Sequence, residues 1–204
     1  HVINYFFFVA EEVREIMAVM GFRTLNEMIG RSDRIDVHRA LTHWKARGLD
    51  FSRLLHRPAA APGVATHQCE QQDHGLDGVL DHRLIAEAAG ALEHGHPVEI
   101  AVEVRNVDRT VGGMLSGRIA RRYGHEGLPR DTIRIAARGV AGQSFGAFLA
   151  AGVSLTLTGA ANDYVGKSLS GGRIAVRPPA ESRIVAAENI IVGNTVLYGA
   201  IAGE

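Results

Sequence analysis

The tripeptide Gly166-Lys167-Ser168 contains residue types that can do chemistry, because glycine, lysine and a hydroxyl group together hold nucleotide phosphates in phosphate loops. The complete pattern needs a glycine five residues before Gly166, and this chain has Ala161 there. It also needs a long helix after the loop, which Leu-Ser-Gly-Gly-Arg does not favour. A nucleotide-binding enzyme is therefore the alternative interpretation, and a turn is the preferred one.

Two further patterns resemble reactive sites. Ser144 lies in Gly-Gln-Ser-Phe-Gly, the pattern of a nucleophile elbow, but glycine returns at 152, before a long helix could form. His67, Cys69 and His74, and separately His94 and His96, offer donors that zinc accepts, without a four-ligand set at established spacing. We interpret both patterns as structural or surface features and predict no catalytic, cofactor-binding or metal site.

Composition excludes several functional classes. The formal net charge is zero and 46% of residues are hydrophobic, so neither nucleic acid nor a membrane is an expected partner. The apolar run at residues 5–10 ends at Glu11 and Glu12, far below the ~20 residues of a membrane span. The single Cys69 excludes a disulfide framework and an iron–sulfur cluster held by this chain alone. An intracellular, reducing compartment fits best, and we expect a cytoplasmic location.

The first half of the chain has helical patterns. Apolar residues in 5–20 recur at helical spacing and stop at Gly21, and Thr24-Leu-Asn-Glu27 has the spacing of a capping box. The proline-bearing, small-residue stretch at 58–66 predicts a linker. A modest helix with Asp81 as its N-cap follows, ending near Gly90. The chain opens at His1 without an initiator methionine, which we interpret as a segment of a longer protein.

After Pro97 the pattern changes to that of strands and glycine-rich turns. Val98, Ile100, Val102 and Val104 alternate with more polar residues, as in a strand with one buried face. Most of the 24 glycines lie in this second half, in a unit that recurs at about 20 to 34 residues. This period is typical of a solenoid whose coils stack into one core. We predict structural corners at Gly112, Gly146, Gly166 and Gly199, and an amide ladder through Asn162 and Asn194.

The same residues resemble a known family. Asn-Val-Asp-Arg-Thr-Val-Gly-Gly-Met-Leu-Ser-Gly from 106, Ala-Asn-Asp-Tyr-Val-Gly-Lys-Ser-Leu-Ser-Gly-Gly from 161 and Gly-Asn-Thr-Val-Leu-Tyr-Gly-Ala from 193 closely resemble the C-terminal GXGXG-type β-helix domain of glutamate synthase large subunits. Residues 1–30 are similar to the end of the flavin-binding synthase domain of that family, and residues 72–77 resemble the connector.

The resemblance implies a mainly β fold, a right-handed parallel β-helix preceded by a helical segment from the end of an α/β barrel. It implies three parts: residues 1–57 end the FMN-binding synthase domain, 58–96 form a linker and connecting helix, and 97–204 form a truncated β-helix domain. The parent enzyme transfers the glutamine amide nitrogen to 2-oxoglutarate and uses FMN and an iron–sulfur cluster. The segment itself is expected to bind no cofactor.

Implied partners are the remaining domains of the large subunit and a small FAD/iron–sulfur subunit, with a homo-oligomer left open. The alternative is a stand-alone β-helix scaffold or binding subunit of another redox complex. Residues 1–57 discriminate between the two, because they make sense as the end of a flavin domain and have no purpose in a free scaffold.

Overall fold

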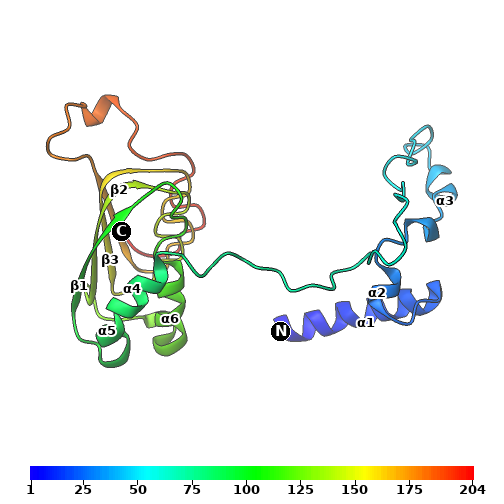
Figure 1. Cartoon of the computed structure of the whole chain (residues 1–204), viewed down its shortest axis with the longest axis horizontal. Helices are drawn as coiled ribbons and strands as arrows, with labels where there is room; N and C mark the ends of the chain where they lie inside the picture. The colour runs from blue at the N-terminus through cyan, green and yellow to red at the C-terminus, as the bar shows by residue number, and fades with distance from the viewer. The chain divides into compact units, whose positions relative to one another are not determined.

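The computed structural model describes residues 1–204, except for the side chains of Arg39, Ala40 and Ala186. The chain divides into two compact units, His1–Asp73 and His74–Glu204, whose helices and strands are labelled in Figure 1. The domain boundaries predicted at 57/58 and 96/97 concern the organisation of a longer protein and stay predictions.

The N-terminal unit consists of short helices after one long one. Helix α1 spans Val2–Met20 and ends at Gly21, whose φ of 79° lets its N–H bond to a carbonyl of the last turn. Helix α2, Leu25–Met28, begins with the predicted capping box, in which Thr24 and Glu27 satisfy each other's backbone N–H groups. The 3₁₀ helix η1, Ser32–Arg34, and helix α3, His38–Leu41, follow.

Apolar side chains of α1 are mostly exposed within this unit. Met17 and Phe22 are the buried apolar side chains among those the structure describes here. Throughout the described part of the chain, no helix is both long enough and apolar enough to cross a bilayer.

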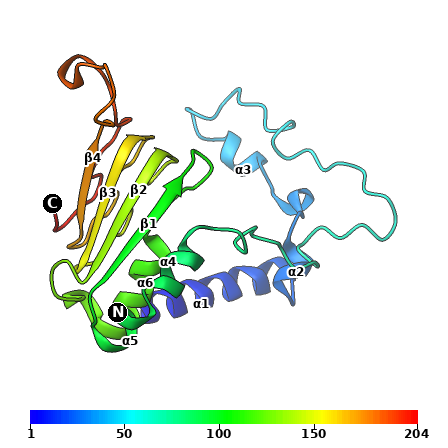
Figure 2. The same cartoon turned by 60° about the vertical axis from the view of Figure 1, so that its left-hand side comes forward.

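The C-terminal unit is built on one parallel sheet. Its elements are α4 (Asp81–Glu87), α5 (Ala89–His94), β1 (Val98–Val104), α6 (Gly113–Tyr123), η2 (Gly124–Glu126), β2 (Ile133–Ala141), β3 (Val153–Ala161), β4 (Arg173–Arg177) and η3 (Ala186–Glu188). The four strands lie in chain order, β1-β2-β3-β4, as Figure 2 shows. Pairing is in register across the sheet, so that Ile100 lies beside Ile135, which lies beside Leu155.

The core lies between one face of this sheet and the helices. Alternate residues of β1, β2 and β3 are buried, including Ile133 and Ile135 of β2, and alternate residues of β4 are half-buried. Leu84 of α4 and Leu115 and Ile119 of α6 meet them from the helical side and are fully buried. Each such side chain contributes about 1.5–3 kcal/mol by leaving water, so alternation in the strands fixes which sheet face carries the helices.

The predicted mainly β, right-handed parallel β-helix is wrong. The strands form a single four-stranded parallel sheet, and more residues lie in helices than in strands. The physical reason lies in the glycine-rich repeats. The first three repeats each lead into one strand of the sheet, β2, β3 or β4, whereas other residues of the repeats form tight turns with left-handed backbone, and the first repeat forms helix α6.

Candidate functional site

Three stacked turns form the feature around which the predicted site residues lie. They span residues 142–149, 162–169 and 193–200, and we call them the turn column. In each turn, alternate residues have left-handed backbone with φ between 53° and 70°. These residues are Ser144, Gly146 and Phe148, then Tyr164, Gly166 and Ser168, then Thr195, Leu197 and Gly199.

Backbone hydrogen bonds join each turn to the next. Between the first and second turns, the N–H groups of Ser144 and Phe148 donate to the carbonyls of Asp163 and Lys167, both at 2.8 Å. The N–H of Gly166 donates in the other direction, to the carbonyl of Phe145 at 2.9 Å. The same three bonds recur between the second and third turns, from Tyr164, Ser168 and Leu197. The backbone groups that take part in these bonds are thus satisfied without water.

Gly146 and Gly166 occupy the central position of the first two turns. A Cβ added at Gly146 would lie 2.4 Å from Cδ1 of Ile174, and one at Gly166 would lie 2.7 Å from Cδ2 of Leu197. Both residues therefore combine left-handed backbone with a close neighbour, the two conditions that favour glycine. The predicted corner role has this geometry at both positions, and its contribution to stability stays a prediction.

Gly112 lies in the layer before Gly146 and also caps the N-terminus of helix α6. It is the N-cap residue of α6 with φ of 91°, and a Cβ there would meet Cδ1 of Leu149 at 2.9 Å. The carbonyl of Val111 accepts from the N–H of Gly146 at 3.0 Å, so Gly112 is in register with Gly146.

The fourth predicted corner is displaced by two residues. The N–H of Leu197 donates to Val165, as that of Gly166 donates to Phe145, so Leu197 is in register with Gly166. Gly199 lies beside Ser168 instead, and a Cβ on Gly199 would come no closer than 3.4 Å to the Ser168 hydroxyl. Aligning the repeats on glycine alone missed this shift, because a leucine takes the left-handed position.

Asn162 and Asn194 are not paired with each other in the structure. The side-chain amide of Asn162 donates to the side-chain carbonyl of Asn106 at 3.2 Å. Asn194 lies at the level of Asp163, whose carboxylate accepts the Asn194 N–H at 2.7 Å. The structure thus joins Asn106 to Asn162, and the predicted ladder between Asn162 and Asn194 is one residue out of register.

Asp81 is the functional side chain that the sequence placed incorrectly. Instead of capping its own helix, its carboxylate accepts N–H groups at the start of α6, from Gly112 and Met114 at 2.7 Å and from Leu115 at 3.1 Å. Asp81 is only 4% exposed. A carboxylate buried at a helix N-terminus offsets both the unpaired N–H groups and the helix dipole. Only the tertiary fold reveals this partner.

Ser116 connects helix α6 to the chain immediately after the first turn. Its buried hydroxyl donates to the Gly112 carbonyl at 2.6 Å and accepts the N–H of Ala150 at 3.1 Å. Together, Asp81 and Ser116 fix α4, α6 and the first turn against one another.

The reactive motifs considered in the sequence lie in turns. Lys167 follows Gly166 in the turn between β3 and β4, with no helix between these strands, and its ammonium lies 5.6 Å from the Tyr164 ring centroid. A phosphate loop needs a helix at this place. Ser144 likewise precedes a turn, not a helix. Among the described residues, no group of three or more metal-binding side chains gathers around the exposed Cys69 or elsewhere.

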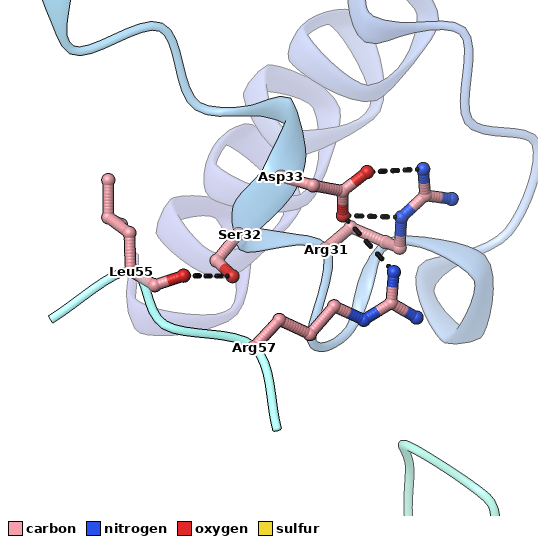
Figure 3. A network of polar contacts seen from close by, with 5 residues as sticks. All are labelled: Arg31, Ser32, Asp33, Leu55 and Arg57. Carbon is pink, nitrogen blue, oxygen red and sulfur yellow. Dashed lines mark hydrogen bonds and ion pairs between the residues drawn. The ribbon is translucent and has the colours of Figure 1, made fainter. Parts of the chain in front are cut away.

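A charged network organises the N-terminal unit (Figure 3). The guanidinium of Arg31 donates two hydrogen bonds of 2.8 Å to the Asp33 carboxylate, and Arg57 lies 3.4 Å from one of its oxygens. The Arg31 guanidinium lowers the pKa of Asp33 to about 2. The Ser32 hydroxyl donates to the Leu55 carbonyl at 2.8 Å. The network joins η1 to the segment around Leu55 and Arg57, and we interpret it as structural.

Comparison of the sequence with known proteins identifies a family. Residues 81–204 match the family model described as the GXGXG motif. The whole chain is 53% identical over 206 residues to a glutamate synthase (NADH) of Schizosaccharomyces pombe and 47% identical over 206 residues to a glutamate synthase (NADPH) large chain of Bacillus subtilis. It is 39% identical over 205 residues to ferredoxin-dependent glutamate synthase 2 of Synechocystis.

The chain belongs to the GXGXG motif family. Along its full length it is similar to one segment of the glutamate synthases. Each alignment covers 100% of this chain but only 10% of the S. pombe relative and 13% of the other two. The chain therefore spans about a tenth of the length of the relatives it matches.

Proposed function

We propose that this chain is a structural segment of a glutamate synthase, and that the longer protein transfers the glutamine amide nitrogen to 2-oxoglutarate. The segment supports neighbouring domains and carries no active site of its own. The observation behind this proposal is the turn column, in which backbone groups and the buried Asp81 and Ser116 serve the fold. Groups held in this way are not available to a substrate.

The cofactors implied for the longer protein, FMN and an iron–sulfur cluster, are assigned to its other domains. Four cysteine ligands hold such clusters, and this chain offers a single, exposed Cys69. The glycine-rich turns use their inward N–H groups to bond neighbouring turns, so they form no cradle for a flavin phosphate. The residues present do not fit either group, and no chemical step is assigned to them.

The partners proposed are the other domains of the large subunit and a small FAD/iron–sulfur subunit, in the cytoplasm. The relatives named above differ in electron donor, as NADH, NADPH and ferredoxin appear in their names. The donor of the present protein is therefore left open.

The experiment that tests the proposal replaces the two residues that most resemble reactive groups, in the complete protein that contains this segment. Lys167→Ala and Ser144→Ala should each leave kcat and KM for glutamine and 2-oxoglutarate unchanged within about twofold, because neither side chain would contact substrate. A fall in kcat of about a hundredfold or more at unchanged folding would show that the segment takes part in the reaction.

A further inference from the structure

The sheet face opposite the helices carries a regular arrangement of side chains, in which Arg134 pairs with Glu99 and Arg138 pairs with Glu181. In-register pairing places outward residues of the four strands in rows that run across the strands. The first row is Glu99, Arg134, Ser154 and Arg173, and the third is Glu103, Arg138, Thr158 and Arg177. The second row, between them, is Ala101, Ala136, Thr156 and Ala175.

Small side chains between two taller charged rows form a trough. A groove of about 680 Å³ lies here, and its lining includes the first row, the small residues of the second and Arg177. Ala101, Ala136 and Ala175 are exposed. The trough is therefore open to a partner, and small residues on its floor allow a backbone to approach closely.

The width of the trough selects the kind of partner. The two charged rows are four residues apart along each strand, which corresponds to about 13 Å at 3.3 Å per residue. An α-helix with its side chains is about 10–12 Å wide and fits between them. A helix lying along the strands would have to cover both charged rows, whereas a helix lying across the strands leaves the arginines at its two flanks.

The distribution of charge along the trough determines in which direction the partner helix would run. The β1 end carries Glu103 and also Glu99, which is paired with Arg134 at 3.1 Å, whereas the far end on β4 is basic, through Arg173 and Arg177. Arg173 lies near Glu204 at 3.5 Å, and Arg177 has only a 3.5 Å hydrogen bond to the Thr158 hydroxyl among the contacts described for it. A helix is positive at its N-terminus and negative at its C-terminus. Its N-terminus therefore matches β1 and its C-terminus matches β4.

We propose that this trough is a docking site for a partner helix from outside this chain, lying across the strands. The partner presents a stripe of alanine or similarly small residues to the floor, basic side chains in its first turn and acidic side chains on both flanks of its last turns. Four strands spaced about 4.8 Å apart span about 14 Å, so about ten helical residues occupy the trough.

The test uses two synthetic peptides of identical composition as probes. Both are alanine-rich helices of about fourteen residues, held helical by the same hydrocarbon staple on the solvent side. The matched peptide has lysines first and glutamates last, and the control has the reverse order. Binding to the 204-residue chain is followed by the amide NMR signals of Ala101, Ala136 and Ala175. We expect the matched peptide to bind about tenfold more tightly than the control, because only its charges complement both ends.

Two variants make the result specific. Ala136→Phe fills the trough from the outward face and should abolish binding, whereas Val140→Phe places the same ring on an exposed strand position outside the groove lining and should not. The double variant Arg173→Glu with Arg177→Glu should weaken the matched peptide about tenfold and strengthen the control. Unfolding midpoints of all variants establish that they are folded.

The proposal is overturned if both peptides bind equally, if neither binds at millimolar concentration, or if the shifted signals lie away from the trough. Stronger binding of a single-stranded oligonucleotide than of the matched peptide would identify a polyanion surface instead. Dimerisation that Ala136→Phe abolishes would identify a second copy of the chain as the occupant.

Discussion

Gly146→Ala is the most direct test of the turn column, because two separate effects lower the free energy of unfolding at this position. The left-handed backbone at φ of 68° costs about 1–2 kcal/mol for a residue with a Cβ. The new Cβ would lie 2.4 Å from Cδ1 and 3.1 Å from Cγ1 of Ile174, and displacing that side chain costs about 1 kcal/mol more. We expect the free energy of unfolding to fall by about 2–3 kcal/mol.

The assay is urea unfolding followed by the amide NMR signals of β2 and β3, which report on the C-terminal unit. Two matched variants separate the costs. Gly199→Ala has φ of 70° but ordinary contact distances, so it should cost about 1–2 kcal/mol. Gly117→Ala lies in α6 with open space around its Cβ, so it should raise stability by about 0.5–1 kcal/mol.

A double mutant isolates the contact with Ile174. Ile174→Val removes Cδ1, so the loss caused by Gly146→Ala should be about 1 kcal/mol smaller when it is measured in the Ile174→Val variant. The predicted clash at Gly146 is absent if Gly146→Ala unfolds at the same urea concentration as the wild type, or if it lowers the free energy of unfolding no more than Gly199→Ala does.

Three further outcomes follow from single contacts. Asp81→Ala leaves three N–H groups of α6 without their acceptor and should cost about 2–4 kcal/mol in the same urea assay; a loss below about 1 kcal/mol would contradict the capping role. Ser116→Ala leaves the buried N–H of Ala150 without a partner and should cost about 1–3 kcal/mol, whereas an unchanged midpoint would show that water replaces the hydroxyl. The lowered pKa of Asp33 means that its ion pair stabilises the N-terminal unit above the ordinary pKa of 3.8, and that this contribution is lost as the pH falls toward about 2. An NMR titration should find the pKa of Asp33 near 2 in the wild type and closer to 3.8 in Arg31→Ala; equal values would refute the assignment.

Local signals in the sequence predicted local structure well. The apolar spacing and Gly21 predicted α1, and the Thr24 capping box predicted α2, because each depends on residues within a few positions. The alternation in β1 was also identified.

Helix α6 was missed for a physical reason. It begins with Gly113 and contains Gly117, so its intrinsic helix propensity is low. Its N-terminus is completed by Asp81, which lies 31 residues earlier than Gly112 in the chain. A contact of that range cannot be deduced from spacing.

The position of the turns was predictable, but the architecture around them was not. Glycine lies at positions 146 and 166, where left-handed backbone and a close neighbour coincide. In the last turn the same position is Leu197, so the repeat could not be aligned on glycine. The spacing also could not distinguish repeated coils of sheet from single strands joined by turns and a helix, and the predicted β-helix failed at this point.

Under the proposed structural role, this segment stabilises the longer protein that contains it and takes no part in the reaction of that protein. The direct measurement is the glutamate-forming rate of the complete protein as a function of its folded fraction, with Gly146→Ala and Asp81→Ala lowering that fraction in graded urea. We expect the rate per folded molecule to be constant for both variants. A fully folded variant with a rate reduced about tenfold or more would contradict it.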